Sequence, residues 1–410
     1  MSGCNGDGEG LFRFLRERVY EMLDPTIVPE DEVLLPIIDE LLLTEPRFSG
    51  LRAAEKVELK RQLYQRVKGL DILSELLAEE EITEIMVNGH DRIFVERRGR
   101  LEKTAARFES EERLFQIIQR ILSTGNRVVN ESSPIVDTRL PDGSRVNVVL
   151  SPISLDGAAL TIRKFPKEVM TLDRLQAFGA LDETVASFLK DLVRARYNIF
   201  ISGGTGSGKT SMLNALAQWI PEDERLLTIE DSAEIQIAGV DNLVRLEVRT
   251  ANMAGENEVS MRQLIRSALR MRPDRILVGE VRGEETVEML QAMNTGHAGS
   301  ISTGHANSAE DMLARLETMV IMAVDIPLSA VRRQIASALE VIIHLGRLRD
   351  GSRKVLEIRE VTGMEGETIH LRTLYRFKET GMTSGQITGK FVKVNNMLQK
   401  EKAERLKADA

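Results

Sequence analysis

The stretch Gly203-Gly-Thr-Gly-Ser-Gly-Lys-Thr210, preceded by the apolar run Tyr197-Asn-Ile-Phe-Ile201, decides the fold of this chain. Its spacing predicts a buried strand, a glycine-rich turn and a helix whose amino end faces an anion. Residues 211–220 continue as that helix, and Pro221 ends it. A chance glycine-rich turn would lack this context on both sides. The stretch is therefore interpreted as a P-loop that binds a nucleoside triphosphate.

The residue types of the loop each suit a phosphate ligand. Backbone N–H groups can wrap the phosphates, because Gly206 and Gly208 allow dihedrals and a close approach that a Cβ would obstruct. Lys209 is expected to reach the β- and γ-phosphates, and the Thr210 hydroxyl to ligate Mg²⁺. The predicted ligands of ATP in this loop are Gly203, Gly204, Thr205, Gly206, Ser207, Gly208, Lys209, Thr210 and Ser211.

The length and composition exclude several classes of protein. At 410 residues, 42% of them hydrophobic and 29% charged, the chain is an ordinary globular protein long enough for more than one domain. Its net charge of −8 gives no overall reason to bind nucleic acid. Cys4 is the only cysteine, and the sequence shows neither a signal peptide nor a run of about 18 apolar residues. We therefore expect a cytoplasmic protein that reaches membranes through partners.

Hydrophobic patterning divides the chain into four parts. Residues 1–70 combine apolar faces, charge and several prolines, which predicts a broken helical segment. Residues 71–165 predict a smaller α+β domain, in which strand-like runs surround a helix at 111–122. Residues 166–173 are expected to form a linker. Residues 174–410 alternate strands and helices, which predicts a parallel α/β domain that ends in a charged helical tail.

Two acidic clusters follow apolar strands of this last domain. Glu280 ends the run Asp274–Glu280, and a strand next to the P-loop strand would place this carboxylate where it can hold Mg²⁺ through water. The second cluster, Leu226–Glu234, offers Glu230, Asp231 or Glu234 to orient or deprotonate water. The alternatives are a solvated acid at 280 and helix capping by Asp231 or Ser232.

Two of the five histidines lie close together, His297 and His305, among small and hydroxylated residues. Taken alone, this would be a coincidence in a polar loop. The spacing fits no common zinc pattern. A phosphate-sensing histidine becomes credible only beside the other elements.

Arginines also recur in patterns. Arg262, Arg266 and Arg270 are spaced by four residues, so they share one face of a predicted helix. That face is either solvated or a cationic surface at a subunit boundary. Arg139 and Arg145 flank Pro141-Asp-Gly143, a turn signal that predicts a hairpin tip.

Together these blocks resemble the traffic ATPases of type II/IV secretion and pilus assembly. The P-loop, an "Asp box" at 228–234, a Gly-Glu Walker B acid and a "His box" at 296–307 match in order. Within this superfamily, residues 269–283 and 289–297 look most like the CpaF branch of Tad-type pilus ATPases. The resemblance covers about residues 71–375 and is highly specific within residues 197–310.

The resemblance implies a hexameric ring that binds ATP between an N-terminal domain and a RecA-like domain. It implies that Lys209 and Thr210 bind phosphate and Mg²⁺, and that Glu280 is the Walker B acid. By the same resemblance Glu234 serves as general base, His305 senses the γ-phosphate and His297 supports the loop.

The resemblance also covers arginines and has two departures. Arg139, Arg145 and Arg163 match arginines that relatives send from the N-terminal domain toward the nucleotide. The tetracysteine zinc site of some branches cannot form with one cysteine. Gly304 stands where many relatives carry a larger apolar residue, a difference expected to loosen the loop before His305.

These features predict an ATPase motor that drives pilus assembly or protein export at an inner-membrane platform protein. The alternative is a conjugative type IV secretion ATPase, and the neighbouring genes would distinguish it from a pilus motor. An alternative of another class is a non-hydrolysing, nucleotide-gated RNA-binding or scaffold protein. The sequence has no Gly-x-x-Gly loop with basic flanks, and a turnover assay would separate this class from the motors.

Overall fold

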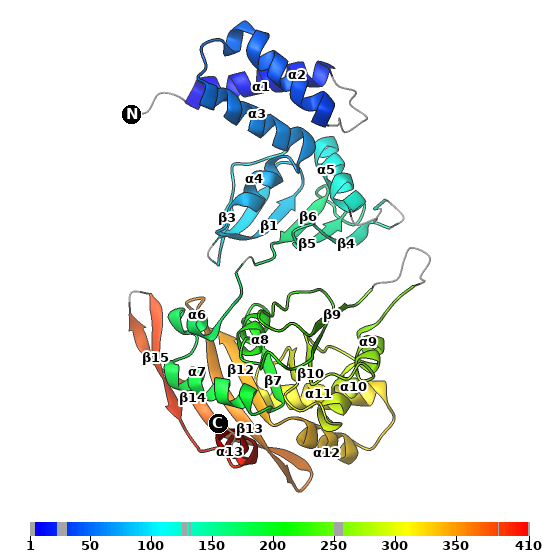
Figure 1. Cartoon of the computed structure of the whole chain (residues 1–410), viewed down its shortest axis with the longest axis vertical. Helices are drawn as coiled ribbons and strands as arrows, with labels where there is room; N and C mark the ends of the chain where they lie inside the picture. Colours follow the sequence, from blue (N-terminus) through cyan, green and yellow to red (C-terminus); the bar gives the residue numbers. More distant parts are fainter. Residues whose placement is uncertain are drawn as a thin grey trace. The chain divides into compact units, whose positions relative to one another are not determined.

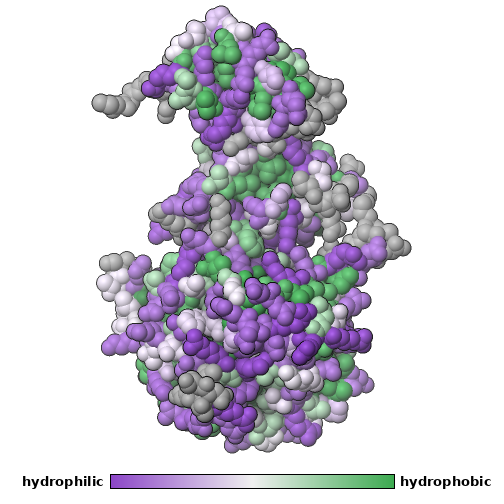
Figure 2. All heavy atoms as spheres, in the orientation of Figure 1, coloured by the Kyte–Doolittle hydropathy of each residue, from purple (hydrophilic) through white to green (hydrophobic). Residues whose placement is uncertain are grey.

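The computed structural model describes residues 5–22, 31–97, 99–124, 129–130, 133–166, 168–249, 257–383 and 385–408. The chain divides into an N-terminal unit, Met1–Pro166, and a C-terminal unit, Lys167–Ala410 (Figure 1). Finer boundaries at residues 70 and 173 stay predictions. Over the described ranges, no helix is long and apolar enough to cross a membrane. Hydrophilic side chains predominate on the face of the C-terminal unit in Figure 2.

The N-terminal unit begins with helices that share a small core. They are α1 (Asn5–Met22), α2 (Asp31–Thr44), the 3-10 helix η1 (Pro46–Phe48) and α3 (Ala53–Lys68). Leu15, Ile38 and Leu63 are fully buried where these helices meet. The prediction that each proline breaks this segment is wrong at Pro36, which lies inside α2. Burial of the apolar face of α2 outweighs the hydrogen bond that a proline removes.

An antiparallel sheet completes the N-terminal unit, in the order β3-β2-β1-β6-β5-β4. Its strands are β1 (Ile82–Asn88), β2 (Ile93–Arg97), β3 (Arg100–Lys103), β4 (Ile135–Arg139), β5 (Arg145–Val149) and β6 (Ala159–Arg163). The short helix α4 (Ile72–Ala78) and α5 (Glu111–Thr124) contribute to its core. The helix predicted at 111–122 is confirmed as α5, and its apolar residues Leu114, Ile117, Ile118 and Ile121 are fully buried.

The C-terminal unit is built on a mixed sheet in the order β15-β14-β13-β12-β7-β11-β10-β8-β9. Its strands are β7 (Ile199–Gly203), β8 (Leu226–Glu230), β9 (Leu243–Glu247), β10 (Arg275–Val278), β11 (Ile301–Gly304), β12 (Val341–Arg347), β13 (Arg353–Glu365), β14 (Thr368–Thr383) and β15 (Gln386–Lys393). Neighbours from β12 to β9 are parallel, whereas β13, β14 and β15 extend the sheet antiparallel. The predicted α/β class is confirmed.

Helices cover both faces of this sheet (Figure 1). One layer contains α6 (Leu172–Ala177), α7 (Glu183–Arg194), α8 (Lys209–Ala217) and α13 (Glu401–Ala408). The other contains α9 (Met261–Ala268), α10 (Thr286–Asn294), α11 (Ala309–Ala323) and α12 (Leu328–Ala338). Alternate residues of β7 serve the two cores, because Ile199 and Ile201 face the first layer and Phe200 the second. The P-loop strand is therefore held on both faces.

The charged helical tail predicted at the end of the chain is present as α13, but antiparallel strands precede it. Residues 353–393 form the three antiparallel strands, and only α13 follows as a helix. The sequence predicted a parallel sheet, but hairpin pairing of β14 with β13 and of β15 with β14 makes residues 353–393 antiparallel. The chain after β15 is also anchored, since buried Glu360 accepts hydrogen bonds from the backbone N–H groups of Leu398 and Gln399.

Candidate functional site

The P-loop lies at the carboxyl end of β7, directly before α8 (Figure 1). Gly206 has φ +69° and Gly208 has φ +97°, a region of backbone conformation that favours glycine. A Cβ on Gly203 would stand 2.5 Å from Ser207 Oγ and 2.6 Å from Leu345 O. The tight turn thus requires glycine, and the strand, turn and helix predicted from the sequence are all present.

Lys209 is the first residue of α8, and its side chain folds back over the loop. Its Nζ donates to the carbonyl oxygens of Gly203 at 3.3 Å and Gly204 at 3.2 Å, and the residue is buried. Thr210 and Ser211 follow in the first turn and are half-buried. The amino end of α8 therefore combines backbone donors, the helix dipole and an ammonium group, which together favour a phosphate.

A contact that the sequence did not predict joins the P-loop to β13. Arg353 Nε donates to the carbonyl oxygen of Gly206 at 2.8 Å, across 147 residues of chain. The stem of Arg353 also covers Gly208, because a Cβ there would lie 3.7 Å from Arg353 Cδ. No local motif marks Arg353, and only the hairpin of β12 and β13 brings it to the loop.

The strand beside β7 on the catalytic side is β11, and β10 lies one strand further along the sheet. The expectation that Glu280 follows the strand next to the P-loop strand is therefore wrong. His305 follows β11 directly and occupies that place. The polar loop expected before it is a buried strand, because the hydroxyl of Thr303 finds an internal partner, the carbonyl oxygen of Gly279, at 2.7 Å.

Glu280 and His305 nevertheless meet at the carboxyl edge of the sheet. Glu280 Oε1 lies 3.1 Å from His305 Nδ1, and Glu280 Oε2 accepts a hydrogen bond of 2.8 Å from Arg282. Burial lowers the pKa of His305 and Lys209 lowers it further, against the opposing effect of Glu280. His305 is thus predominantly neutral near pH 7. Glu280 Oε1 is buried and makes no well-aligned hydrogen bond within the described residues, as expected of an atom that awaits a ligand.

The acidic residues of the Asp box, Glu230 and Glu234, lie in different environments. Glu230 is buried at the end of β8, and its Oε2 accepts from the backbone N–H groups of Glu234 at 2.6 Å and Ile235 at 2.7 Å. Burial raises the pKa of Glu230, although those N–H groups oppose the shift. Glu234 is half-buried, and its carbonyl oxygen accepts from Asn214 of α8 at 3.1 Å. The structure thus brings Glu234 beside the helix that follows the P-loop. The alternative of helix capping by Asp231 or Ser232 is excluded, because no helix follows β8 here.

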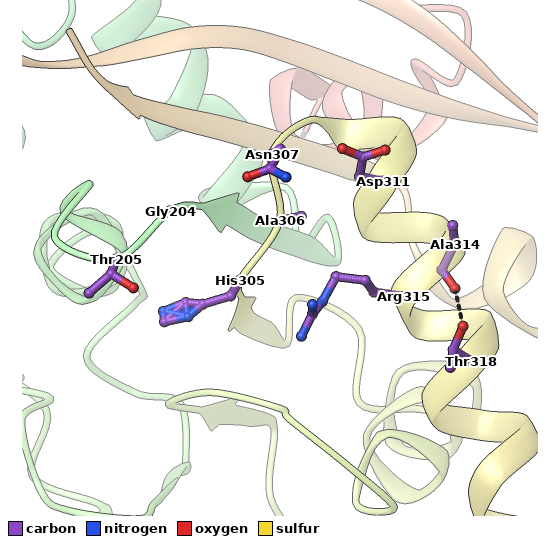
Figure 3. A pocket seen from close by; sticks show the side chains of 9 residues that line it. All are labelled: Gly204, Thr205, His305, Ala306, Asn307, Asp311, Ala314, Arg315 and Thr318. Carbon is purple, nitrogen blue, oxygen red and sulfur yellow. Dashed lines mark hydrogen bonds between the residues drawn. The ribbon is translucent and has the colours of Figure 1, made fainter. Parts of the chain in front are cut away.

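A cavity of about 580 Å³ opens beside the first part of the P-loop (Figure 3). Its lining residues are Gly204, Thr205, His305, Ala306, Asn307, Asp311, Ala314, Arg315 and Thr318. Figure 3 shows His305 extending toward Thr205, and Arg315 extending from α11 toward His305. The sequence analysis predicted only the first three of these residues. Ala306 and Asn307 lie in the His box at 296–307, whereas Asp311, Ala314, Arg315 and Thr318 stand on α11, where no motif marks them as part of a site.

Gly304 is a packing requirement and does not loosen the loop. A Cβ there would stand 3.0 Å from both Met312 Sδ and Phe200 Cε1. The residue is buried, and in the β7–β11 register it lies opposite Ser202. The expectation of a looser loop before His305 is therefore wrong, since Phe200 and Met312 fill the space that a side chain would take.

Two predicted features are not brought to the P-loop of this unit. His297 precedes β11 at the amino end of the strand, with its Nδ1 3.3 Å from the carbonyl oxygen of Ala292, whereas the P-loop lies at the carboxyl end. The arginine stripe is engaged elsewhere, because Arg262 and Arg266 both donate to Glu288 Oε1, at 2.9 and 2.7 Å, although Arg266 and Arg270 are exposed. Arg262 and Arg266 thus join α9 to α10, and Arg270 lies beyond the end of α9.

In the N-terminal unit, the three predicted arginines form one row. Arg139 lies opposite Arg145 in the β4–β5 ladder, and Arg145 lies opposite Arg163 in the β5–β6 ladder. Directly opposed residues point to the same face of a sheet. The alternating residues Val146 and Ile162 are buried in the core, so the row lies on the other face. The predicted hairpin tip between Arg139 and Arg145 is confirmed.

Comparison with known proteins assigns a family to this architecture. Residues 66–404 match the family model described as "Type II/IV secretion system protein". A putative conjugal transfer protein of Mycobacterium tuberculosis is 36% identical over 312 residues, which are 75% of this chain and 88% of that protein. The conjugal transfer protein TrbB of Rhizobium radiobacter is 35% identical over 300 residues, covering 72% of this chain and 88% of TrbB.

A solved structure supports the fold assignment. The crystal structure of the pilus retraction motor PilT with bound ADP matches with a TM-score of 0.52 and 22% identity, over 83% of this chain and 87% of that one. At this identity the match concerns the fold alone. The prediction of a RecA-like ATPase unit that follows a smaller sheet domain is confirmed.

Proposed function

Since this chain belongs to the type II/IV secretion system protein family and is a traffic ATPase of secretion or pilus assembly, we propose that it hydrolyses ATP at the amino end of α8. The observation that supports this site is the meeting of three elements at one sheet edge: the P-loop, Glu280 and His305. Such a cluster can bind a triphosphate and also hold a carboxylate near the phosphorus.

The residues divide the chemistry among them. The loop from Gly203 to Ser211 holds the phosphates, and Lys209 leaves its two carbonyl contacts of 3.2–3.3 Å to neutralise β- and γ-phosphate charge. Thr210 and, through water, Glu280 would hold Mg²⁺, which when bound draws charge from the phosphate oxygens. Glu280 Oε1, which is buried and makes no well-aligned hydrogen bond within the described residues, fits this use. Glu234 orients the attacking water and accepts its proton, while neutral His305 reports the γ-phosphate.

The quaternary arrangement is also part of the proposal. We infer a homohexameric ring in the cytoplasm that works at an inner-membrane platform protein. In such a ring Arg139, Arg145 and Arg163 would reach the nucleotide, because guanidinium groups match phosphate oxygens and remain charged. The row that these residues form supports the idea of a phosphate-facing surface. His297, at the opposite edge of β11, would act only by supporting the chain before that strand.

The kind of machine that the ATPase drives is proposed in two versions, which differ in the cargo that is moved. The similarity to conjugal transfer proteins over most of the chain favours a conjugative or type IV secretion ATPase. Residues 269–283 and 289–297 favour the CpaF branch of Tad-type pilus ATPases, and this second candidate rests on those two runs only. Deletion of the gene separates the two candidates. Loss of DNA transfer would support the conjugative ATPase, and loss of pilin export would support the pilus ATPase.

Lys209→Ala tests the proposed function directly. We expect ATP turnover to fall by at least 100-fold while the fold stays intact, because a charged contact on the transferring phosphate is worth about 3 kcal/mol. Lys390→Ala is the matched control, an exposed lysine of β15 in the same unit. Phosphate release is measured in both variants. Turnover of the Lys209 variant within threefold of the unmodified protein would refute the site.

A further inference from the structure

The cavity beside the P-loop contains a cation that the proposed hydrolysis does not use. Arg315 lies in the second turn of α11 and lines this cavity together with Gly204, Thr205 and His305 (Figure 3). It is exposed, and within the described residues its guanidinium makes neither an ion pair nor a hydrogen bond. A guanidinium without a partner in the wall of a cavity is suited to bind an anion from solution.

The other residues that line the cavity indicate which kind of anion Arg315 can bind. Asn307 and Thr205 add neutral polar groups, and the Thr318 hydroxyl is already committed to the carbonyl oxygen of Ala314 at 2.9 Å. Asp311 adds one carboxylate to the same wall. One arginine next to one carboxylate indicates that the cavity binds an anion weakly. Weak binding suits a small, strongly charged ion that is released to solvent after it binds.

The geometry of phosphoryl transfer indicates where such an ion comes from. The attacking and leaving oxygens stand roughly in line, so the transferred group moves away from ADP toward the side of the water. The cavity touches the P-loop only at Gly204 and Thr205, ahead of Lys209, and it shares His305 with Glu280. It therefore opens on the γ-phosphate side of the loop.

We propose that this cavity is the first binding site of inorganic phosphate after hydrolysis, with Arg315 as its anion-binding residue. The inference rests on the proposed function. In the step concerned, the oxygen of water bonds to the γ-phosphorus and the bond from phosphorus to the bridging oxygen breaks. ADP keeps that electron pair, and the proton of water passes to a carboxylate. Inorganic phosphate then moves from Lys209 to Arg315 before it reaches solvent.

The test is phosphate binding to protein saturated with ADP and Mg²⁺, measured by phosphorus-31 NMR. ADP occupies the P-loop, so a second anion reports the cavity. We expect Arg315→Gln to weaken phosphate binding roughly 10- to 100-fold, the scale of one charge-assisted contact. Arg315→Lys should retain part of the affinity, because the charge remains but the planar fork is lost. ADP affinity should stay within twofold in both variants.

Arg333→Gln is the matched control, since Arg333 is an exposed arginine of α12 whose only hydrogen bond within the described part of the chain is to Ser329 O of its own helix. Its substitution should leave phosphate binding unchanged. Equal weakening in both glutamine variants, unchanged binding in Arg315→Gln, or no phosphate binding to the ADP-loaded protein would each overturn the inference. Phosphate binding is measured without ATP turnover, so this test can fail independently of the proposed function. The proposed function fails if Lys209→Ala leaves turnover intact.

Discussion

At the scale of single residues, two acids of one motif lie in different environments. Glu230 and Glu234 lie four positions apart, and the sequence offered both as catalytic candidates. Glu230 is buried, has a raised pKa, and holds the backbone N–H groups of Glu234 and Ile235. Glu234 is half-buried beside α8. The structure thus favours Glu230 as the positioning residue and Glu234 as the proposed base.

This division predicts different effects of the same substitution. Glu234→Gln should lower kcat by at least 100-fold while ATP binding stays within threefold, because an amide cannot accept the proton of water. Glu230→Gln should instead lower the melting temperature, since an amide oxygen is a weaker acceptor for two N–H groups than a carboxylate. Single-turnover kinetics and thermal denaturation of both variants check this. Normal hydrolysis by the Glu234 variant would transfer the role of base to Glu230.

At the scale of elements, β11 determines where the histidine stands. The strand is buried on all four residues and pairs with β7 on one side and β10 on the other. It places His305 one residue beyond the register position of Ser202, the last residue before the P-loop stretch. Gly304 permits this because Phe200 and Met312 close over it. His305 and the P-loop therefore follow adjacent, tightly packed strands.

Gly304→Val should disturb both stability and catalysis. The new side chain would enter space held by Phe200 and Met312, and overpacking of this kind costs about 1–3 kcal/mol. We expect a lower denaturation midpoint together with a reduced kcat, because His305 would shift away from Glu280. Chemical denaturation and steady-state turnover measure the two effects.

Gly381→Ala provides the control for this substitution. Gly381 lies in β14, where a Cβ would meet only Thr388 Oγ1 at an ordinary 3.8 Å. Both quantities should change little there. A Gly304 variant with the stability and turnover of the unmodified protein would show that β11 does not need its glycine.

At the scale of the whole molecule, each unit carries part of the proposed chemistry. The C-terminal unit has the P-loop, Glu280 and His305, whereas the N-terminal unit has the arginine row. Glu288 of α10 engages Arg262 and Arg266 of the arginine stripe, so a role of this stripe at a subunit boundary stays a prediction. The case for assembly therefore rests on the row Arg139, Arg145 and Arg163 and on the family.

Assembly predicts that specific activity rises with protein concentration. With a non-hydrolysable ATP analogue the protein should sediment as a ring, expected to be a hexamer, because the proposed phosphate contacts of the arginine row form only there. Analytical ultracentrifugation and turnover across the micromolar range test this, with Lys209→Ala as the variant that should lose the effect of the analogue. A monomer with constant specific activity throughout would argue against the ring.

Local patterns were enough to predict the P-loop, the α/β class and the helix at 111–122. These features depend on residues within about ten positions of one another, so periodicity and spacing carry them. The acids at 230, 234 and 280 were found in the same way, because each one ends or follows a short apolar strand.

Long-range pairing decided the rest. The insertion of β11 between β7 and β10, the contact of Arg353 with Gly206 and the approach of His305 and Arg315 to the P-loop join residues far apart in the chain. Strand order and helix docking follow from how whole apolar faces are buried together, and this packing also overrode the local signals at Pro36, Gly304 and the antiparallel C-terminal strands. A pattern read along one segment contains no information about the segment that packs against it.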